Sequence, residues 1–192
     1  MKKVNRYIID GKSVPGVTTI IGWRMSKGLC IGFFGKNTPE EAKKIGDAGK
    51  EFGEMVHKLV AGHIGKQKQT LNEVQQTILD NFKLVTEGWE WLETEKIVLN
   101  KAHMYGGTAD AIAIVNGKKT LVDIKTGGLY DGQEAVQLSA YKECLPEVEQ
   151  CIVLHLDKET NAWEVLNRET EGIFKVFRAF KTIYDYETGK TQ

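Results

Sequence analysis

Residues 106–128 read GGTADAIAIVNGKKTLVDIKTGG, and they decide the fold. Small and apolar residues dominate positions 108–115, Asn116-Gly117 follows, and a second largely apolar run covers 120–125. Asn-Gly is the dipeptide best suited to a type I′ turn, because both central positions need positive φ. The stretch therefore predicts one β-hairpin.

The predicted hairpin carries two carboxylates and a lysine. Side chains alternate along a strand, so Asp123 and Lys125 share a face, and the turn brings Asp110 alongside Asp123. A lone buried carboxylate is very costly, so these charges must be paired, bound to metal or placed at the rim of the sheet. Two carboxylates beside a lysine suit a divalent cation and a phosphate substrate. A simple Asp123–Lys125 salt bridge is the alternative explanation.

Length and composition bound the class of protein. The 192 residues, 41% hydrophobic and 27% charged, are typical of one soluble globular domain covering 1–192. The sequence has no apolar run of 18 residues and no apolar signal-peptide core at its N-terminus, so we expect no membrane association. Cys30, Cys144 and Cys151 are widely spaced, which favours reduced thiols and a cytoplasmic location.

Charge is unevenly distributed. The formal net charge of the chain is zero, but residues 1–36 contain seven Lys or Arg against one Asp, a net charge of +6. A basic segment of this kind can guide a polyanion towards an acidic centre. A solvated lysine-rich terminus explains the same charge equally well.

The remaining elements follow from turn signals and periodicity. Asp10-Gly11 predicts a short hairpin over 4–15, and Thr38-Pro39 predicts the start of a helix over 39–64. Residues 16–21 predict a short helix or strand, 24–38 an irregular loop that completes a basic N-terminal region (1–38), and 187–192 a disordered tail. Further helices are expected over 70–87, 131–145 and 169–186, and strands over 92–100, 151–156 and 162–166.

Three of these elements carry candidate functional side chains. In the helix over 39–64, Gly46, Gly49 and Gly53 fall on one side, and His57 continues that side. A lone helical histidine is most often a core or surface residue, but this one stands where another element can approach closely. Gln137 and Tyr141, four apart, share a helix face. The last helix carries an aromatic stripe that we assign to the core.

In this order the residues resemble the PD-(D/E)xK nuclease superfamily, in its RecB-type branch with phage exonucleases and the mitochondrial genome-maintenance exonuclease group. The resemblance covers the chain from Tyr7 to about His155. The matching motifs are Gly53-Glu54-Met55-Val56-His57, Gly107-Thr108-Ala109-Asp110, Asp123-Ile124-Lys125-Thr126-Gly127 and Gln137-Leu138-Ser139-Ala140-Tyr141, with Glu95, or less naturally Glu93, as an earlier acid.

The resemblance implies an α/β fold with a restriction-endonuclease-like core, in which helices flank a central mixed β-sheet. It implies a metal-dependent DNA exonuclease that hydrolyses phosphodiester bonds at single-stranded or duplex ends in recombination, repair or phage DNA processing. Two Mg²⁺ or Mn²⁺ ions would be held by His57, Asp110, Asp123 and the Ile124 carbonyl, and the imidazole favours Mn²⁺. The remaining catalytic groups would be Lys125, Gln137, Tyr141 and, through water, Glu95.

The resemblance also implies partners. DNA would contact Thr18, Thr19, Arg24 and Lys27, although Gly16 stands where phage-type members have serine. A recombination or phage protein is a further expected partner, and the resemblance to phage exonucleases implies a bacterial or phage-encoded protein. Three cysteines cannot reproduce the four-cysteine iron–sulfur pattern of some relatives, so no cluster is expected. Two alternatives stay open, an endonuclease of restriction or resolvase type and a catalytically inactive DNA-binding protein on the same fold.

Overall fold

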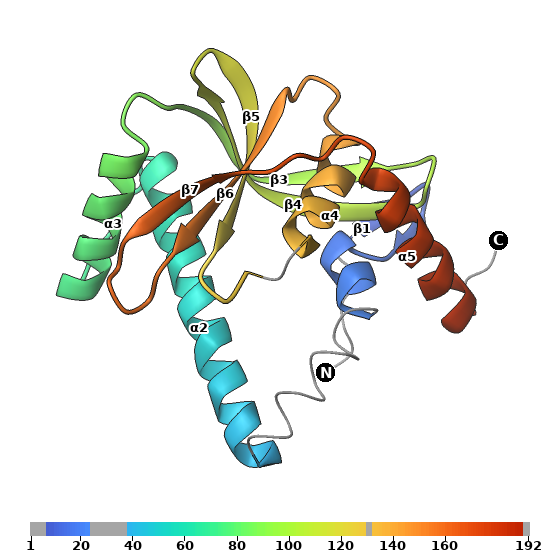
Figure 1. Cartoon of the computed structure of the whole chain (residues 1–192), viewed down its shortest axis with the longest axis horizontal. Helices are drawn as coiled ribbons and strands as arrows, with labels where there is room; N and C mark the ends of the chain where they lie inside the picture. Colours follow the sequence, from blue (N-terminus) through green and yellow to red (C-terminus); the bar gives the residue numbers. More distant parts are fainter. Residues whose placement is uncertain (1–6, 24–37, 130–131, 190–192) are drawn as a thin grey trace.

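The computed structural model describes residues 7–23, 38–129 and 132–189. Helices flank a central five-stranded sheet with the strand order β3-β4-β5-β6-β7 (Figure 1). All neighbouring strands of this sheet are antiparallel except β5 and β6, which run parallel. The sheet is therefore mixed, and the predicted α/β class with a helix-flanked mixed sheet is confirmed.

The predicted hairpin is present as β4 (Tyr105–Val115) and β5 (Lys118–Lys125). Asn116 and Gly117 join the two strands with φ values of 52° and 77°, as a type I′ turn requires. β6 (Gln150–Leu156) and β7 (Trp163–Asn167) extend the sheet on one side, and β3 (Glu90–Asn100) forms the opposite edge.

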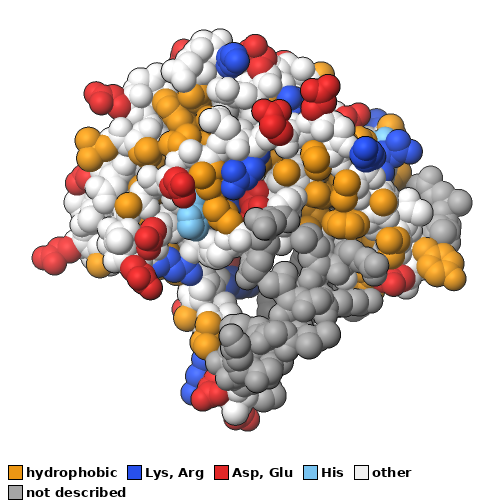
Figure 2. Space-filling view, viewed as in Figure 1, with side chains coloured by type: hydrophobic (Ala, Val, Ile, Leu, Met, Phe, Trp, Pro, Cys, Tyr) orange, Lys and Arg blue, Asp and Glu red, His pale blue; other side chains and the backbone are white. Residues whose placement is uncertain are grey.

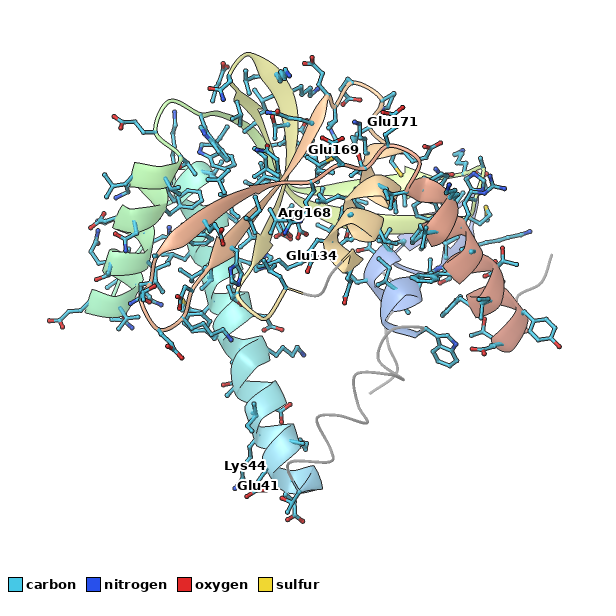
Figure 3. The ribbon with its side chains drawn as sticks, in the orientation of Figure 1. Glu41, Lys44, Glu134, Arg168, Glu169 and Glu171 are labelled. Carbon is cyan, nitrogen blue, oxygen red and sulfur yellow. The ribbon has the colours of Figure 1, made fainter. Side chains whose placement is uncertain are left out.

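The longest helix is α2 (Pro39–Ile64), with the predicted bounds. Thr38 and Glu41 form a capping box, in which each side chain accepts a hydrogen bond from the other's backbone N–H. Glu41 and Lys44 lie at the end of α2 that projects beyond the sheet (Figure 3). Only the C-terminal part of α2 therefore packs on the sheet.

Each face of the sheet buries its own hydrophobic cluster. α2 and α3 (Glu73–Val85) cover one face, and α4 (Gln133–Lys142) and α5 (Phe174–Glu187) cover the other (Figure 1). Phe177 of the predicted aromatic stripe is fully buried, and Phe174 and Phe180 pack against the same cluster. That stripe is core, as expected.

The N-terminal hairpin joins the molecule beside β4. Its strands are β1 (Tyr7–Ile9) and β2 (Lys12–Val14), and the chain then forms a bridge between Gly16 and Gly106. Residues 17–23 are helical, and Val17, Ile20 and Ile21 are buried in the cluster under α4 and α5.

Helix ends differ most from the predicted bounds. α3 begins after Asn72 rather than at Thr70, because Asn72 forms a capping box with Gln75. α4 begins at Gln133 rather than 131, after Gly132 with φ 82°, and the chain passes into tight turns after Lys142. α5 begins at Phe174 rather than 169.

Two further expectations need correction. Glu187 belongs to α5 and accepts a hydrogen bond from Trp23 Nε1, so the predicted disordered tail does not begin there. β3 begins at Glu90 rather than 92, with a shift of register between Trp91 and Glu93. The predicted loop over 24–38 lies, apart from Thr38, outside the described residues. Among the described helices, none has the length and apolar character needed to cross a bilayer.

Candidate active site

A cavity of about 660 Å³ opens where β4, β5, α2, α4 and the N-terminal hairpin meet. Charged and aromatic side chains share its wall. The described residues that line it are Tyr7, Thr18, Gly53, Glu54, His57, Lys58, Ala61, Glu95, Thr108, Asp110, Asp123, Lys125, Gln137 and Tyr141.

Asp110 marks the point where β4 separates from β5. The pairing of these strands covers β4 only from Ala111 to Val115, so Asp110 is the first residue beyond the ladder. Its Oδ2 accepts a hydrogen bond from the Ile124 backbone N–H at 2.8 Å. Ala109 packs in the hydrophobic cluster under α4 and α5, and Ala111 packs in the cluster on the other face of the sheet, although residues two apart on a regular strand share a face. The alternation of side chains between the two faces of the sheet is therefore interrupted at Asp110.

His57 approaches Asp110 from α2. Its Nδ1 lies 3.3 Å from Asp110 Oδ1. One turn earlier, a Cβ at Gly53 would lie 3.2 Å from Thr126 Oγ1, so this glycine lets α2 approach the end of β5. Burial lowers the pKa of His57, but the hydrogen bond and charge of Asp110 outweigh burial and the net pKa is raised.

Glu95 faces Asp110 across the β3–β4 ladder. Thr94 pairs with Ala111 and Lys96 with Ala109, which sets Glu95 opposite Asp110. Glu95 has φ 51°, an unusual value for a residue other than glycine. One ligand atom each from His57, Glu95 and Asp110 lie within 4.8 Å of one another.

Glu93, the weaker candidate for the earlier acid, lies elsewhere. It pairs with Lys96 at 2.7 Å on the exposed part of β3 and is not among the described residues that line the cavity. Of the two glutamates, the structure therefore brings only Glu95 to the candidate site.

Asp123 lies at the bottom of the cavity and is 2% exposed. Its Oδ1 accepts a hydrogen bond from Gln137 Nε2 at 2.7 Å, and its Oδ2 lies 2.7 Å from Lys125 Nζ. Despite that ion pair, Oδ2 is buried without a hydrogen bond of good geometry from any described group. Lys125 also donates to Gln137 Oε1 at 3.3 Å.

Burial and charge act in opposition on this pair. Burial raises the pKa of Asp123, as does the charge of Asp110, while Lys125 and His57 oppose the shift. Burial lowers the pKa of Lys125, but the charges of Asp123 and Asp110 outweigh it, so the net pKa is raised. Lys125 is therefore a cation at neutral pH.

Tyr141 closes the cavity from α4. A Cβ on Gly107 would lie 2.2 Å from Tyr141 Cε1, so only glycine there leaves room for the ring. Burial raises the pKa of Tyr141 well above its usual value, and the charges of Asp123 and Asp110 add to the shift. The phenol is therefore a hydrogen-bond donor at any moderate pH.

The four predicted DNA-binding residues divide into three cases. Thr18 is exposed and lines the cavity, whereas Thr19 is exposed but is not among the described residues that line it. Arg24 and Lys27 lie outside the described residues.

Several residues of the cavity wall are not predicted as site residues from the sequence, and among them are Tyr7, Lys58 and Thr108. Thr108 could have been found, because it stands two residues before Asp110 on one strand. Tyr7 could not, since its hydroxyl lies 3.1 Å from Thr108 Oγ1 across 101 residues of sequence.

The donor set fits a divalent cation. Carboxylate oxygens suit Mg²⁺ and Mn²⁺, and an imidazole favours the softer Mn²⁺. His57, Glu95 and Asp110 are grouped closely enough to share one ion. The buried Oδ2 of Asp123, which lacks a well-formed hydrogen bond, adds acceptor capacity in the same cavity.

Figure 2 shows Lys and Arg scattered among Asp and Glu on the described part of one face. This mixture agrees with a formal net charge of zero for the chain. The described part of this face therefore shows charges of both signs side by side.

No protein-family model and no curated protein matches the chain. Among solved structures, the crystal structure of SSO0001 matches with a TM-score of 0.47 and 16% identity, over 92% of this chain and 79% of that one. The alkaline exonuclease LHK-Exo from Laribacter hongkongensis matches with a TM-score of 0.38 and 10% identity, over 71% and 84% of the chains. The crystal structure of LHK-Exo in complex with dAMP matches with a TM-score of 0.38 and 13% identity, over 71% of this chain and 85% of that one. These values are too low to bear on activity.

Proposed function

We propose that the chain is a metal-dependent nuclease of the RecB-like type, which hydrolyses phosphodiester bonds at single-stranded or duplex DNA ends. The observation that carries this proposal is the meeting of His57, Glu95 and Asp110 within 4.8 Å, in one cavity with Asp123 and Lys125. Acids, an imidazole and a lysine in one cavity match what metal-assisted phosphoryl chemistry requires.

The chain's own residues would hold Mn²⁺ or Mg²⁺ as follows. His57, Glu95 and Asp110 would supply one side-chain atom each. Asp123 Oδ2 would supply another while it stays paired with Lys125. The N–H of Ile124 points to Asp110, and the N–H and C=O of one strand residue point to the same side. The Ile124 carbonyl is thus directed to the gap between β4 and β5. Bound metal supplies Lewis acidity and lowers the pKa of water.

Three side chains prepare the attack on phosphorus. Lys125, charged and paired with Asp123, offsets the negative charge that grows on the phosphate oxygens. Gln137 fixes the Asp123 carboxylate through Oδ1 and accepts from Lys125, which holds both groups in place. Tyr141, kept protonated, donates a hydrogen bond to the phosphate or to the attacking water.

Cleavage of end-labelled DNA tests the proposal. The purified chain should degrade single-stranded or duplex DNA with Mn²⁺ and lose all activity with chelator. Asp123→Asn, which keeps the side-chain shape at this buried position, should abolish cleavage. No metal-dependent cleavage by the wild type, or full cleavage by Asp123→Asn, would overturn the assignment.

The same assay separates the exonuclease from the two alternatives. An exonuclease spares closed circular DNA and releases mononucleotides or short products from labelled ends, whereas an endonuclease linearises the circle. A catalytically inactive DNA-binding protein retains DNA in a mobility-shift assay without product. The pairing of Lys125 with Asp123 inside the cavity favours a catalytic role, because pure binding does not need a buried, costly ion pair.

A further inference from the structure

Tyr7, on the short N-terminal hairpin, lines the cavity and is held there by contacts with two other segments of the chain. Its ring rests on two glycines that come from different segments. A Cβ at Gly106 would lie 2.7 Å from Tyr7 Cγ, and a Cβ at Gly16 would lie 3.0 Å from its Cε2. Any other residue at position 106 would displace the ring.

Two backbone contacts hold the segments that clamp the ring. Gly16 and Gly106 form a β-bridge, and the N–H of Gly106 donates to the Pro15 carbonyl at 3.0 Å. The Tyr7 hydroxyl lies 3.1 Å from Thr108 Oγ1, two residues before Asp110 on β4. The ring is therefore fixed at both its face and its tip relative to a predicted metal ligand.

The ring also differs from the other apolar groups of the cavity. Tyr141 lines the same cavity but is only 4% exposed, so its faces are covered by protein. Tyr7 is partly exposed, and Ala61 is too small to offer a flat surface. The His57 ring is also partly exposed, but its Nδ1 lies against Asp110. Of the two tyrosines among the described lining residues, Tyr7 is thus the one whose ring has surface left for a ligand.

We infer that Tyr7 is a binding residue on which a nucleobase of the substrate stacks, so that the site takes base-bearing nucleic acid and not any phosphodiester. This inference rests on the proposed nuclease function. Tyr7, Asp110 and Lys125 line one cavity, so a phosphate held at Asp110 and Lys125 would place its nucleoside in the cavity that Tyr7 also lines. Aromatic side chains stack on every base, which gives affinity without sequence preference.

A comparison of two substrates tests the inference without a variant. An oligothymidylate is compared with an oligomer of equal length made of abasic sites, under Mn²⁺. The wild type should cleave the abasic oligomer with a KM raised about tenfold. Equal KM values for both overturn the inference and leave the nuclease function standing. Cleavage of neither substrate overturns the nuclease function itself.

Variants assign the effect to the ring. Tyr7→Phe keeps the ring and loses the Thr108 contact, so its KM on the oligothymidylate should stay near that of the wild type. Tyr7→Leu should raise KM about tenfold with little change in kcat, and should lose the preference for the base-bearing oligomer. Tyr186→Leu, on an exposed part of α5, is the matched control.

A fluorescent base separates stacking from a structural role. Binding should quench 2-aminopurine in an oligonucleotide with the wild type and Tyr7→Phe, but not with Tyr7→Leu, in Ca²⁺ to slow cleavage. Thermal melting shows whether each variant is folded. Equal quenching and an equal base preference in folded Tyr7→Leu overturn the inference. If Tyr7→Leu does not fold, the comparison of the two substrates decides.

Discussion

At the scale of single residues, the ion pair of Asp123 with Lys125 offsets the free energy that is lost when the Asp123 carboxylate is buried. Asp123 is buried beside a second acid, which raises its pKa, and Lys125 is the cation that offsets this. Breaking a buried pair by removal of one partner is costly, because the other charge is left uncompensated. The pair should therefore be thermodynamically coupled.

A double-mutant cycle tests the coupling. In metal-free buffer at pH 8, Lys125→Met should lower the free energy of unfolding by about 2 kcal/mol, less than for a fully buried pair because the lysine is partly exposed. Adding Asp123→Asn should recover part of that loss, since it removes the uncompensated charge. Chemical denaturation measures all four proteins. Strictly additive losses would contradict the coupling.

The same variant gives a pH dependence. Loss of Lys125 removes a group that lowers the pKa of Asp123, so in Lys125→Met the carboxyl takes up a proton more readily in the folded state. A pKa raised on folding contributes stability at low pH that is lost as pH rises through the folded pKa. The deficit of Lys125→Met should thus shrink from pH 8 to pH 5. A deficit that grows on acidification would contradict this sign.

Two glycines give opposite predictions for the same substitution. Gly107→Ala should displace the Tyr141 ring, cost about 2 kcal/mol of stability and reduce cleavage, because its Cβ would lie 2.2 Å from Tyr141 Cε1. At Gly46 an added Cβ would have no described atom within 4 Å apart from neighbouring residues and the backbone of its own helix, so Gly46→Ala should stabilise α2 by about 1 kcal/mol and leave cleavage unchanged. Thermal melting and a cleavage assay check both variants. Equal changes in stability and cleavage for Gly107→Ala and Gly46→Ala would contradict the close packing of Tyr141 on Gly107.

At the scale of elements, the β4–β5 hairpin holds Asp110 and Asp123 in one frame. Gly117 has φ 77° in the turn, a conformation that costs alanine about 1 kcal/mol. Gly117→Ala should lower the melting temperature and leave kcat unchanged below the transition, because the turn lies at the other end of the hairpin from the cavity. A lowered kcat with unchanged melting would show that the hairpin is not a rigid frame.

Elements with strong local signals could be predicted from the sequence, and those set by tertiary contacts could not. The turn at Asn116-Gly117 and the start of α2 at Thr38-Pro39 were predictable, because turn and cap chemistry decide them locally. The faces to which the side chains of β4 point were not predictable, since their alternation is interrupted at Asp110, where pairing with β5 ends. The position of Tyr7 depends on a contact across 101 residues.

At the scale of the whole molecule, the candidate site forms only when separate units dock on one another. α2 brings His57, β3 brings Glu95 and the hairpin brings Asp110. A ligand that binds only this folded arrangement stabilises it by mass action. Mn²⁺ at about 100 times its Kd should raise the stability of the wild type by about 2.7 kcal/mol. Asp110→Asn should lose this gain in a thermal melt, and an equal gain would place the ion elsewhere.

The convergence of distant residues on one cation is tested most directly by Mn²⁺ titration calorimetry on two glutamate variants of the same strand. Glu95→Gln replaces the carboxylate grouped with His57 and Asp110 by a neutral amide, whereas Glu93→Gln alters a residue paired with Lys96 outside the cavity. We predict that Glu95→Gln weakens Mn²⁺ binding at least about tenfold, which corresponds to about 1.4 kcal/mol, and that Glu93→Gln binds like the wild type. Equal Mn²⁺ affinity for Glu95→Gln and the wild type would contradict the account.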